Sequence, residues 1–82
     1  MLTTGNQLRA ARSLIGMGQS ELAERAGVHS NTIGAMERCG ADTLTSGLDK
    51  VRAVQEALEA AGVEFLNHGR PGVRLTKPDT SP

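Results

Sequence analysis

The sequence predicts a small, mostly α-helical domain of four helices that ends in a β-hairpin. Its 82 residues are enough for one domain with a small core. Apolar residues recur at helical spacing in four segments, and glycines separate these segments. After the fourth segment, two short runs of alternating apolar and polar residues flank a stretch rich in turn formers, which is typical of a hairpin.

The helices of the N-terminal half are expected to be short. Residues 1–4 are expected to form a flexible N-terminus, in which Thr3 or Thr4 can cap the first helix. Glycines at positions 16 and 18 end that helix, and the second helix starts at Gln19 or Ser20. The three helices are therefore expected to cover about residues 5–15, 19–26 and 30–38.

The joint between the second and third helices is the most informative feature. Gly27 can adopt a positive φ without steric cost, so the second helix can end there and the chain can turn sharply. Val28 can fill the angle between the helices, and the small Ala23 lets them approach closely. With Ile33 and Met36 facing inward, the third helix keeps a small, polar outer face for a partner. This arrangement is typical of DNA-binding proteins.

The C-terminal half is expected to add a helix over residues 47–61, which completes a helical domain of residues 5–61, and a hairpin over residues 62–77. The residues of the helix's apolar stripe are Leu48, Val51, Val54 or Gln55, and Leu58. The residues on the buried face of the hairpin are Val63, Phe65, Val73 and Leu75. Residues 78–82 are expected to form a disordered tail. Because an isolated hairpin is marginal in water, this one must pack on the helices or pair with a second copy.

Composition limits the classes of function. The chain is 38% hydrophobic, and its nine basic residues balance nine acidic ones. Phe65 is its single aromatic residue, which argues against RNA or single-stranded DNA because these are bound largely by aromatic stacking. No apolar run is long enough to span a membrane, and the N-terminus has no hydrophobic signal segment, so we expect a cytoplasmic protein.

The sequence offers no grouping for catalysis or metal binding. Cys39 is the one cysteine, so neither a disulfide within the chain nor a thiolate cluster can form, and we expect a small half-buried side chain. His29 and His68 have no acidic partner at ligand spacing. We therefore expect no enzyme activity, no metal and no cofactor.

Four short motifs occur in order along the first half of the chain. They are Gln19-Ser20-Glu21-Leu22-Ala23, Ala26-Gly27-Val28, Ser30-Asn31-Thr32-Ile33 and Met36-Glu37. In these motifs, and over about residues 5–60, the chain resembles the Xre (Cro/CI-type) helix-turn-helix family of bacterial and phage transcription regulators. The hairpin is similar to one appended in some short members. The resemblance implies a lambda-repressor-like DNA-binding domain that inserts its third helix in the major groove of a double-stranded operator, usually as a homodimer.

The resemblance also assigns residues to the DNA interface. Gln19 at the start of the second helix would contact a phosphate and brace the third helix, and Ser20 beside it is a further candidate. The positions that face the groove are His29, Ser30, Asn31, Gly34 and Ala35. The candidate phosphate contacts on the third helix are Thr32 and Arg38. Many relatives carry Arg or Gln where this chain has Ser30, Gly34 and Ala35, so the bidentate reader of guanine is missing.

Each of these assignments has a plain structural alternative. Ser30 can cap the third helix instead of contacting DNA. Gly34 costs about 1 kcal/mol relative to Ala within a helix, so it is either a tolerated weak residue or a place where the backbone approaches DNA closely. Ala35 can touch a thymine methyl or simply favour the helix. The arginines that could clamp phosphates, or be ordinary surface charges, are Arg9, Arg12 and Arg38.

The sequence thus predicts a sequence-specific regulator, a repressor, that acts as a homodimer. The suspected dimerisation residues of the hairpin are Phe65, Leu66, Val73 and Leu75. The alternative is a seam on the fourth helix through Val51, Val54 and Leu58. Zero net charge and the short side chains of the third helix favour a second function, an adaptor that binds another protein, such as an antitoxin or an antagonist of a regulator.

Overall fold

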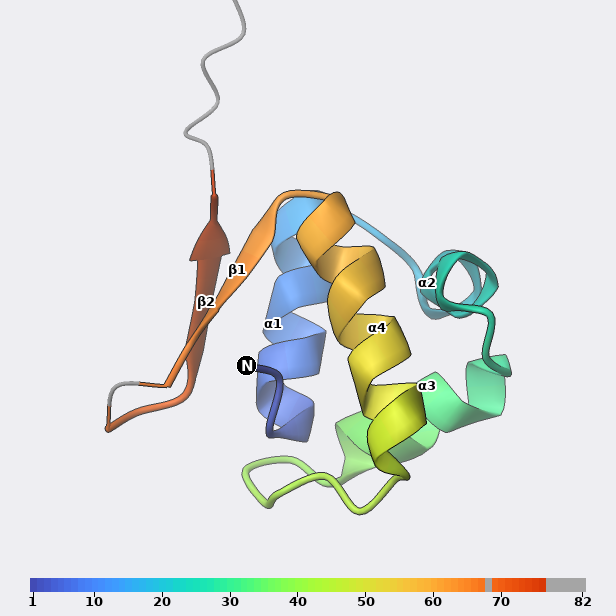
Figure 1. The fold of residues 1–82 in the computed structure, drawn as a ribbon, viewed down its shortest axis with the longest axis horizontal. Helices are drawn as coiled ribbons and strands as arrows, with labels where there is room; N and C mark the ends of the chain where they lie inside the picture. The colour runs from blue at the N-terminus through green and yellow to red at the C-terminus, as the bar shows by residue number, and fades with distance from the viewer. Residues whose placement is uncertain (68, 77–82) are drawn as a thin grey trace, which may run out of the picture.

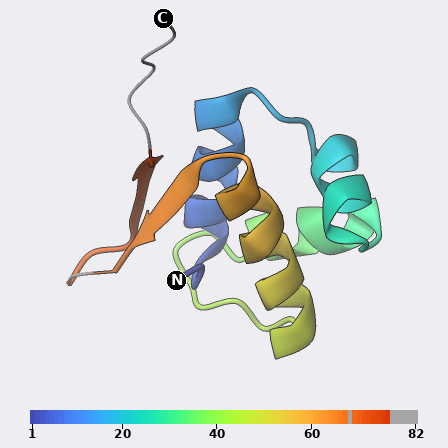
Figure 2. The same ribbon diagram turned by 45° about the horizontal axis from the view of Figure 1, so that its top comes forward.

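The computed structural model describes residues 1–67 and 69–76 and shows a small, mostly helical domain with an antiparallel hairpin (Figure 1). In this part of the chain the elements are α1 (Gly5–Ile15), α2 (Gln19–Ala26), α3 (Ser30–Arg38), α4 (Leu48–Ala60), β1 (Val63–Leu66) and β2 (Gly72–Leu75). Figures 1 and 2 both place the hairpin and the pair α2–α3 on opposite sides of α1 and α4. The expected end of the hairpin at residue 77 and the tail of residues 78–82 lie outside the described residues.

The ends of the first helices have local causes. Thr4 and Gln7 form a capping box at the start of α1, with each side chain accepting the backbone N–H of the other residue at 3.1–3.2 Å. α1 ends at Gly16 and α2 ends at Gly27, whose φ angles of 66° and 72° lie in the left-handed region that glycine favours. The predicted bounds of α1, α2 and α3 are confirmed.

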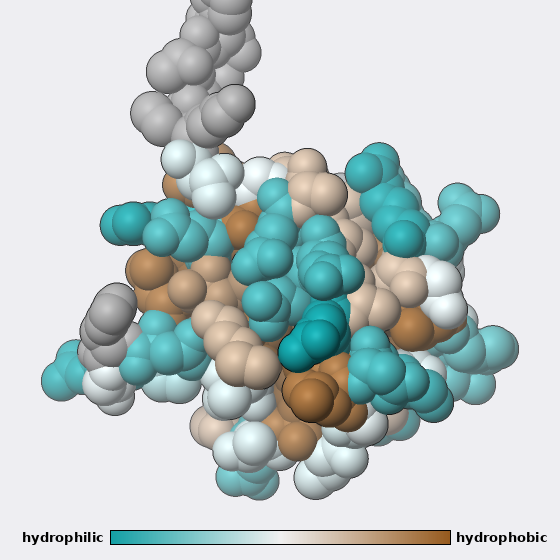
Figure 3. All heavy atoms as spheres, viewed as in Figure 1, coloured by the Kyte–Doolittle hydropathy of each residue, from teal (hydrophilic) through white to brown (hydrophobic). Residues whose placement is uncertain are grey.

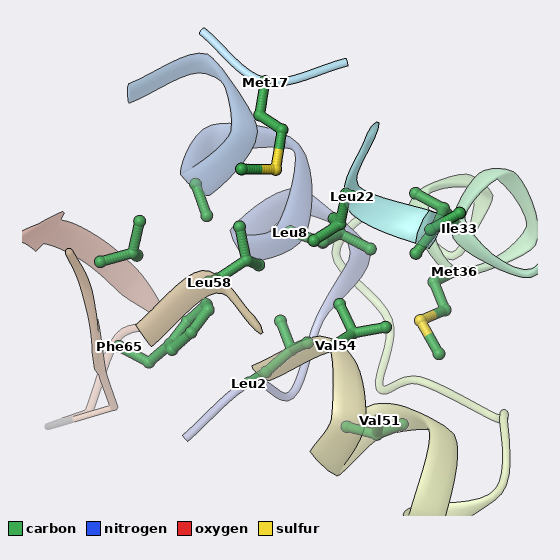
Figure 4. Close-up of a cluster of buried hydrophobic side chains, with 13 residues drawn as sticks. Leu2, Leu8, Met17, Leu22, Ile33, Met36, Val51, Val54, Leu58 and Phe65 are labelled. Carbon is green, nitrogen blue, oxygen red and sulfur yellow. The ribbon is translucent and has the colours of Figure 1, made fainter. Parts of the chain in front are cut away.

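The core lies where the helices meet and continues beneath the hairpin. Figure 4 shows Leu8, Leu22 and Ile33 gathered where α1, α2 and α3 come together, and all three side chains are fully buried. Phe65 reaches from β1 toward Leu58 of α4 and is 8% exposed. The single aromatic ring of the chain therefore fastens the hairpin to the helices.

Both strands of the hairpin pack against helices: α4 packs against β1, and α1 packs against both strands. Phe65 pairs with Val73 and Val63 with Leu75 in an antiparallel register, so these four side chains share a face. Val63 is fully buried and Val73 half-buried, but Leu75 is 40% exposed. The prediction that Leu75 belongs to the buried face is therefore wrong. The reason is that α1 covers β2 near its start, where Gln7 bonds to Gly72, whereas Leu75 lies at the other end of the strand. With respect to α4, β2 is the outer strand, since β1 lies between it and α4 (Figures 1 and 2).

The first residues do not form the flexible N-terminus that was expected, because they pack against the rest of the domain. Leu2 is 1% exposed within the core, and its N–H donates to Oε1 of Gln55 at 2.9 Å. The Met1 ammonium donates to Oδ1 of Asn67 at 2.7 Å. The side-chain Nε2 of Gln7 in α1 also donates to the hairpin, to the carbonyl oxygens of Leu66 and Gly72, each at 3.3 Å. N-terminus, α1 and hairpin are thus joined.

α4 is shorter than expected, and its buried face does not include the first residue of the predicted apolar stripe. It starts at Leu48, with Gly47 as its N-cap, and its buried residues are Val51, Val54 and Leu58. Leu48 is 61% exposed, so its assignment to the core is wrong. A step of three residues falls about 60° short of a full helical turn, which takes Leu48 away from the line through Val51 and Leu58.

We expect Gly5→Ala to destabilise the protein by about 2–3 kcal/mol, as measured by urea unfolding, because it overpacks a backbone contact. A Cβ at Gly5 would collide with the carbonyl oxygen of Met36 and lie 2.9 Å from that of Glu37, where α1 meets the end of α3. Asn6→Ala, in the same turn but exposed, is the control and should change stability by less than about 0.5 kcal/mol. Equal effects of the two variants would contradict this close approach.

Candidate nucleic-acid interface

α2 and α3 are held at their angle by a compact turn. The Val28 N–H donates to the Ala23 carbonyl at 3.0 Å, and Val28 packs half-buried against the core. Ala23 is 4% exposed, so the small residue lies where the prediction placed it. His29 caps α3, since its Nδ1 accepts the Asn31 N–H at 3.1 Å. The N-cap of α3 is therefore His29, and the alternative interpretation, that Ser30 caps the helix, is wrong.

α3 has one buried face and one open face. Ile33 and Met36 are fully buried, as expected. The predicted interface residues that are exposed on or beside α3 are His29, Asn31, Ala35 and Arg38. Those that are half-buried are Ser30, Thr32 and Gly34. The open face thus presents small and polar side chains over its whole length and ends in one arginine.

The carboxylate of Glu37 lies inside the domain and joins three helices. Its side chain is 3% exposed and receives two hydrogen bonds from Arg12 of α1, at 2.5 and 2.9 Å. Gln19 at the start of α2 donates to the same carboxylate at 2.9 Å. Arg12 also donates to the Met17 carbonyl at 2.9 Å, which ties in the loop before α2. The network fixes the end of α3 against both neighbouring helices.

The electrostatic balance at Glu37 favours the ionised form. Burial alone raises the pKa of Glu37, but the hydrogen bonds from Arg12 and Gln19 outweigh it, so that the pKa lies below its ordinary value. The pKa of Arg12 is raised by its hydrogen bond to Glu37. Both groups therefore carry their charges at neutral pH, and the two charges cancel inside the domain.

This network changes the roles of the predicted phosphate contacts. The side chain of Arg12 is 19% exposed. Its guanidinium nitrogens donate to the Glu37 carboxylate and to the Met17 carbonyl, so the expectation that Arg12 clamps a phosphate is wrong. Arg9 keeps a side chain that is 62% exposed, with its Nε 3.9 Å from the Glu37 carboxylate. Gln19 and Ser20 are exposed at the start of α2, and the predicted bracing of α3 by Gln19 is seen in its bond to Glu37.

The burial of Glu37 was not foreseen, although the sequence carries a signal for it. Glu37 follows Ile33 by four residues and therefore lies on the same side of α3 as the core. Its partner, Arg12, lies 25 residues earlier in the sequence and on another helix, so residue spacing within one helix cannot predict the contact. As a consequence of this burial, the open face of α3 has no exposed acidic side chain.

Gly34 has no packing role within the described part of the domain. A Cβ at this position would meet only the Nη1 of Arg38, at 3.5 Å, which is an ordinary contact. Glycine nevertheless costs about 1 kcal/mol relative to Ala in a helix. The fold thus tolerates a larger residue on the open face of α3, at a position where the chain keeps the smallest one.

The two surfaces suspected of dimerisation differ in accessibility. Val51, Val54 and Leu58 are buried inside the domain, so a seam between copies through these α4 residues is ruled out. Phe65 is also buried, which corrects its assignment as a dimer contact. Leu66 and Val73 are half-buried and Leu75 is 40% exposed, so these residues remain accessible on the hairpin.

Neither a scan against models of protein families nor a search of curated proteins finds a match for the chain.

Within residues 1–67 and 69–76, no three His, Cys, Asp or Glu side chains gather closely enough to hold a metal ion, and Cys39 is half-buried at the end of α3. None of the described helices has the length and apolar character needed to cross a membrane.

We expect Glu37→Gln to lower the free energy of unfolding by about 2–4 kcal/mol at pH 7, because it leaves the enclosed Arg12 without its counter-charge. Since the pKa of folded Glu37 lies below the ordinary 4.5, its charge stabilises the fold above that value, and this contribution is lost as pH falls through the folded pKa. The difference in stability between parent and variant should therefore be constant between about pH 8 and pH 5 and shrink below about pH 4.5.

Urea unfolding of both proteins across this range measures the difference. Glu24→Gln, at an exposed position of α2, is the control and should match the parent within about 0.5 kcal/mol. A difference between parent and Glu37→Gln that stays constant to about pH 3 would show that the carboxylate is not held ionised by Arg12.

Proposed function

We propose that the protein is a sequence-specific, duplex-DNA-binding transcription regulator of the helix-turn-helix type, which inserts α3 in the major groove. The observation that carries the proposal is the open face of α3, which is small, polar and free of exposed acidic side chains because Glu37 is buried and neutralised. A surface of this kind can approach the phosphate-lined groove without charge repulsion, and the groove is wide enough for a helix.

Base recognition in this proposal rests on the first half of α3. Asn31 is exposed, and an Asn side chain can bond bidentately to adenine. Ala35 is exposed one turn further on and can contact a thymine methyl. Gly34 between them would let the helix backbone lie close to the bases. These contacts read A·T pairs, in keeping with the lack of a long side chain for guanine.

Phosphate contacts would come from residues around α3. Gly18 precedes α2 without a side-chain cap, so within the described part of the chain no cap occupies the first N–H groups of that helix, which can donate to an anion. The Gln19 amide has two N–H donors and gives one to Glu37, which leaves one for a phosphate. Arg38 and Arg9 are exposed at the end of α3 and on α1. We infer repression by occupancy of an operator, with the protein acting as a homodimer.

A second candidate function, an adaptor that binds another protein, is favoured by one surface. Leu48 and Met1 are 61% and 59% exposed and line the same shallow groove between the N-terminus and the start of α4. Figure 3 shows hydrophilic side chains over most of α4 and hydrophobic surface near its lower end. An adaptor would use this groove and would leave α3 free, so failure of the purified chain to bind any duplex would favour it.

Gly34→Ala should separate stability from DNA binding. We expect the variant to be more stable by up to about 1 kcal/mol, because Ala favours the helix, yet to bind a duplex from upstream of its gene at least about tenfold more weakly, because the methyl group enters the DNA interface. Ala60→Gly, at an exposed position of α4, is the matched control and should do the reverse, losing stability and keeping affinity. Unchanged DNA affinity in Gly34→Ala would show that α3 does not approach the bases at this residue.

Asn31→Ala and Arg38→Ala should lose different parts of the binding. Fluorescence anisotropy at several salt concentrations should show that Asn31→Ala loses about 1–3 kcal/mol on the upstream duplex and little on a random-sequence duplex. Arg38→Ala should weaken binding to both duplexes and lower the slope of log K against log salt by about 1. Parent-like affinity of Asn31→Ala on the upstream duplex would remove α3 from the interface.

A further inference from the structure

The outer strand of the hairpin has an open hydrogen-bonding edge. The Thr76 N–H donates to the Gly62 carbonyl at 2.8 Å, which makes residues 62 and 76 a hydrogen-bonded pair. Such pairs alternate along an antiparallel ladder, so Arg74 also points its N–H and C=O toward β1. The N–H and C=O groups of Val73 and Leu75 point the other way. Among the described residues, these four groups have no backbone partner.

The side chains along this edge suit a neighbour. On the inner face, Val73 is half-buried and Leu75 is 40% exposed, and Figure 3 shows hydrophobic surface along β2. On the outer face, Arg74 is paired with Glu64 through hydrogen bonds of 2.9 and 3.2 Å, so the strand carries no net charge there. Exposed edges are usually protected by charged side chains, bulges or proline. β2 has no proline and pairs in an uninterrupted register, and its one charged side chain, Arg74, is neutralised by Glu64.

We propose that β2 pairs antiparallel with β2 of a second copy of this chain, which joins two hairpins into one four-stranded sheet. A twofold axis perpendicular to the sheet keeps the inner faces of both hairpins on the same side. Residues that face each other across the axis must then point to the same face, so the axis passes through a residue of β2 and not between two residues.

The axis passes through Arg74 in this dimer. That register places Val73 opposite Leu75 of the second copy and Leu75 opposite its Val73, which forms four backbone hydrogen bonds from the groups that face outward. An axis through Val73 would place Leu75 opposite Pro71, which has no N–H. An axis through Leu75 would pair only that residue within β2. Each copy of Arg74 keeps its own Glu64, so the two guanidinium groups meet as neutralised pairs.

The edge of β2 is the contact between the two copies in the proposed homodimer. The inference therefore rests on that part of the proposed function. This edge lies across the domain from α3 (Figures 1 and 2). Its test therefore uses no DNA, so failure of the dimer and failure of DNA binding can be told apart.

Cross-linking through cysteine tests the register, in a Cys39→Ser background that removes the native thiol. The two copies of residue 74 form a non-hydrogen-bonded pair, whose Cα atoms lie about 4.5 Å apart, within the range of a disulfide. With oxidised glutathione as oxidant, Arg74→Cys should give mostly covalent dimer, because each pair of thiols is oxidised to one disulfide across the axis. Val73→Cys, whose thiol faces Leu75 of the second copy, should give several-fold less. Equal yields from the two variants, or no covalent dimer from Arg74→Cys, would overturn the register.

Amide hydrogen exchange on the parent chain tests the dimer without any substitution. The N–H groups of Val73 and Leu75 should exchange at least about tenfold more slowly at high protein concentration, where light scattering shows twice the chain mass, than after dilution. The Arg74 N–H, which is bonded within the hairpin, should be protected at both concentrations. Exchange of Val73 and Leu75 that does not change with concentration would overturn the proposal, and so would a single-chain mass at every concentration.

Discussion

The buried ion pair between Glu37 and Arg12 determines how α3 packs against its neighbouring helices. A carboxylate that is 3% exposed needs its partners, and here the partners come from α1 and from the start of α2. The pair therefore fixes the orientation of α3 and removes the one acidic side chain of α3 from its open face. It also engages Arg12, so that Arg38 of α3 and Arg9 of α1 are the predicted phosphate contacts among the arginines that stay exposed.

A second polar network, centred on Gln7, joins α1 to the hairpin on the opposite side of the domain. Gln7 closes the cap of α1 and donates to two carbonyl oxygens of the hairpin, so α1 is tied to α3 at one face and to β1 and β2 at another. Figures 1 and 2 show the consequence, in which α3 and β2 lie on opposite sides of one rigid helix. The proposed DNA contact and the proposed dimer contact are thereby held in a fixed relation without touching each other.

Local features were predictable from the sequence, and long-range partners were not. The glycines at 16 and 27 marked the ends of α1 and α2, and the periodicity of Ile33 and Met36 gave the buried face of α3. Pattern alone could not report that Leu2 enters the core or that Arg12 meets Glu37, because both depend on how helices pack rather than on spacing within one helix. Leu48 and Leu75 were misplaced for the same reason, since each continues an apolar pattern beyond the part that its neighbours cover.

The most direct test of the central claim, that α3 reads base edges, is selection of bound duplexes from a random library by the purified chain at low salt. We expect enrichment of one short motif, repeated in inverted orientation at a spacing of whole helical turns. We also expect A·T pairs to dominate the contacted positions, as Asn31 and Ala35 require. Recovery of duplexes with no shared sequence would show that α3 does not read base edges, and so would a chain that retains no duplex at all.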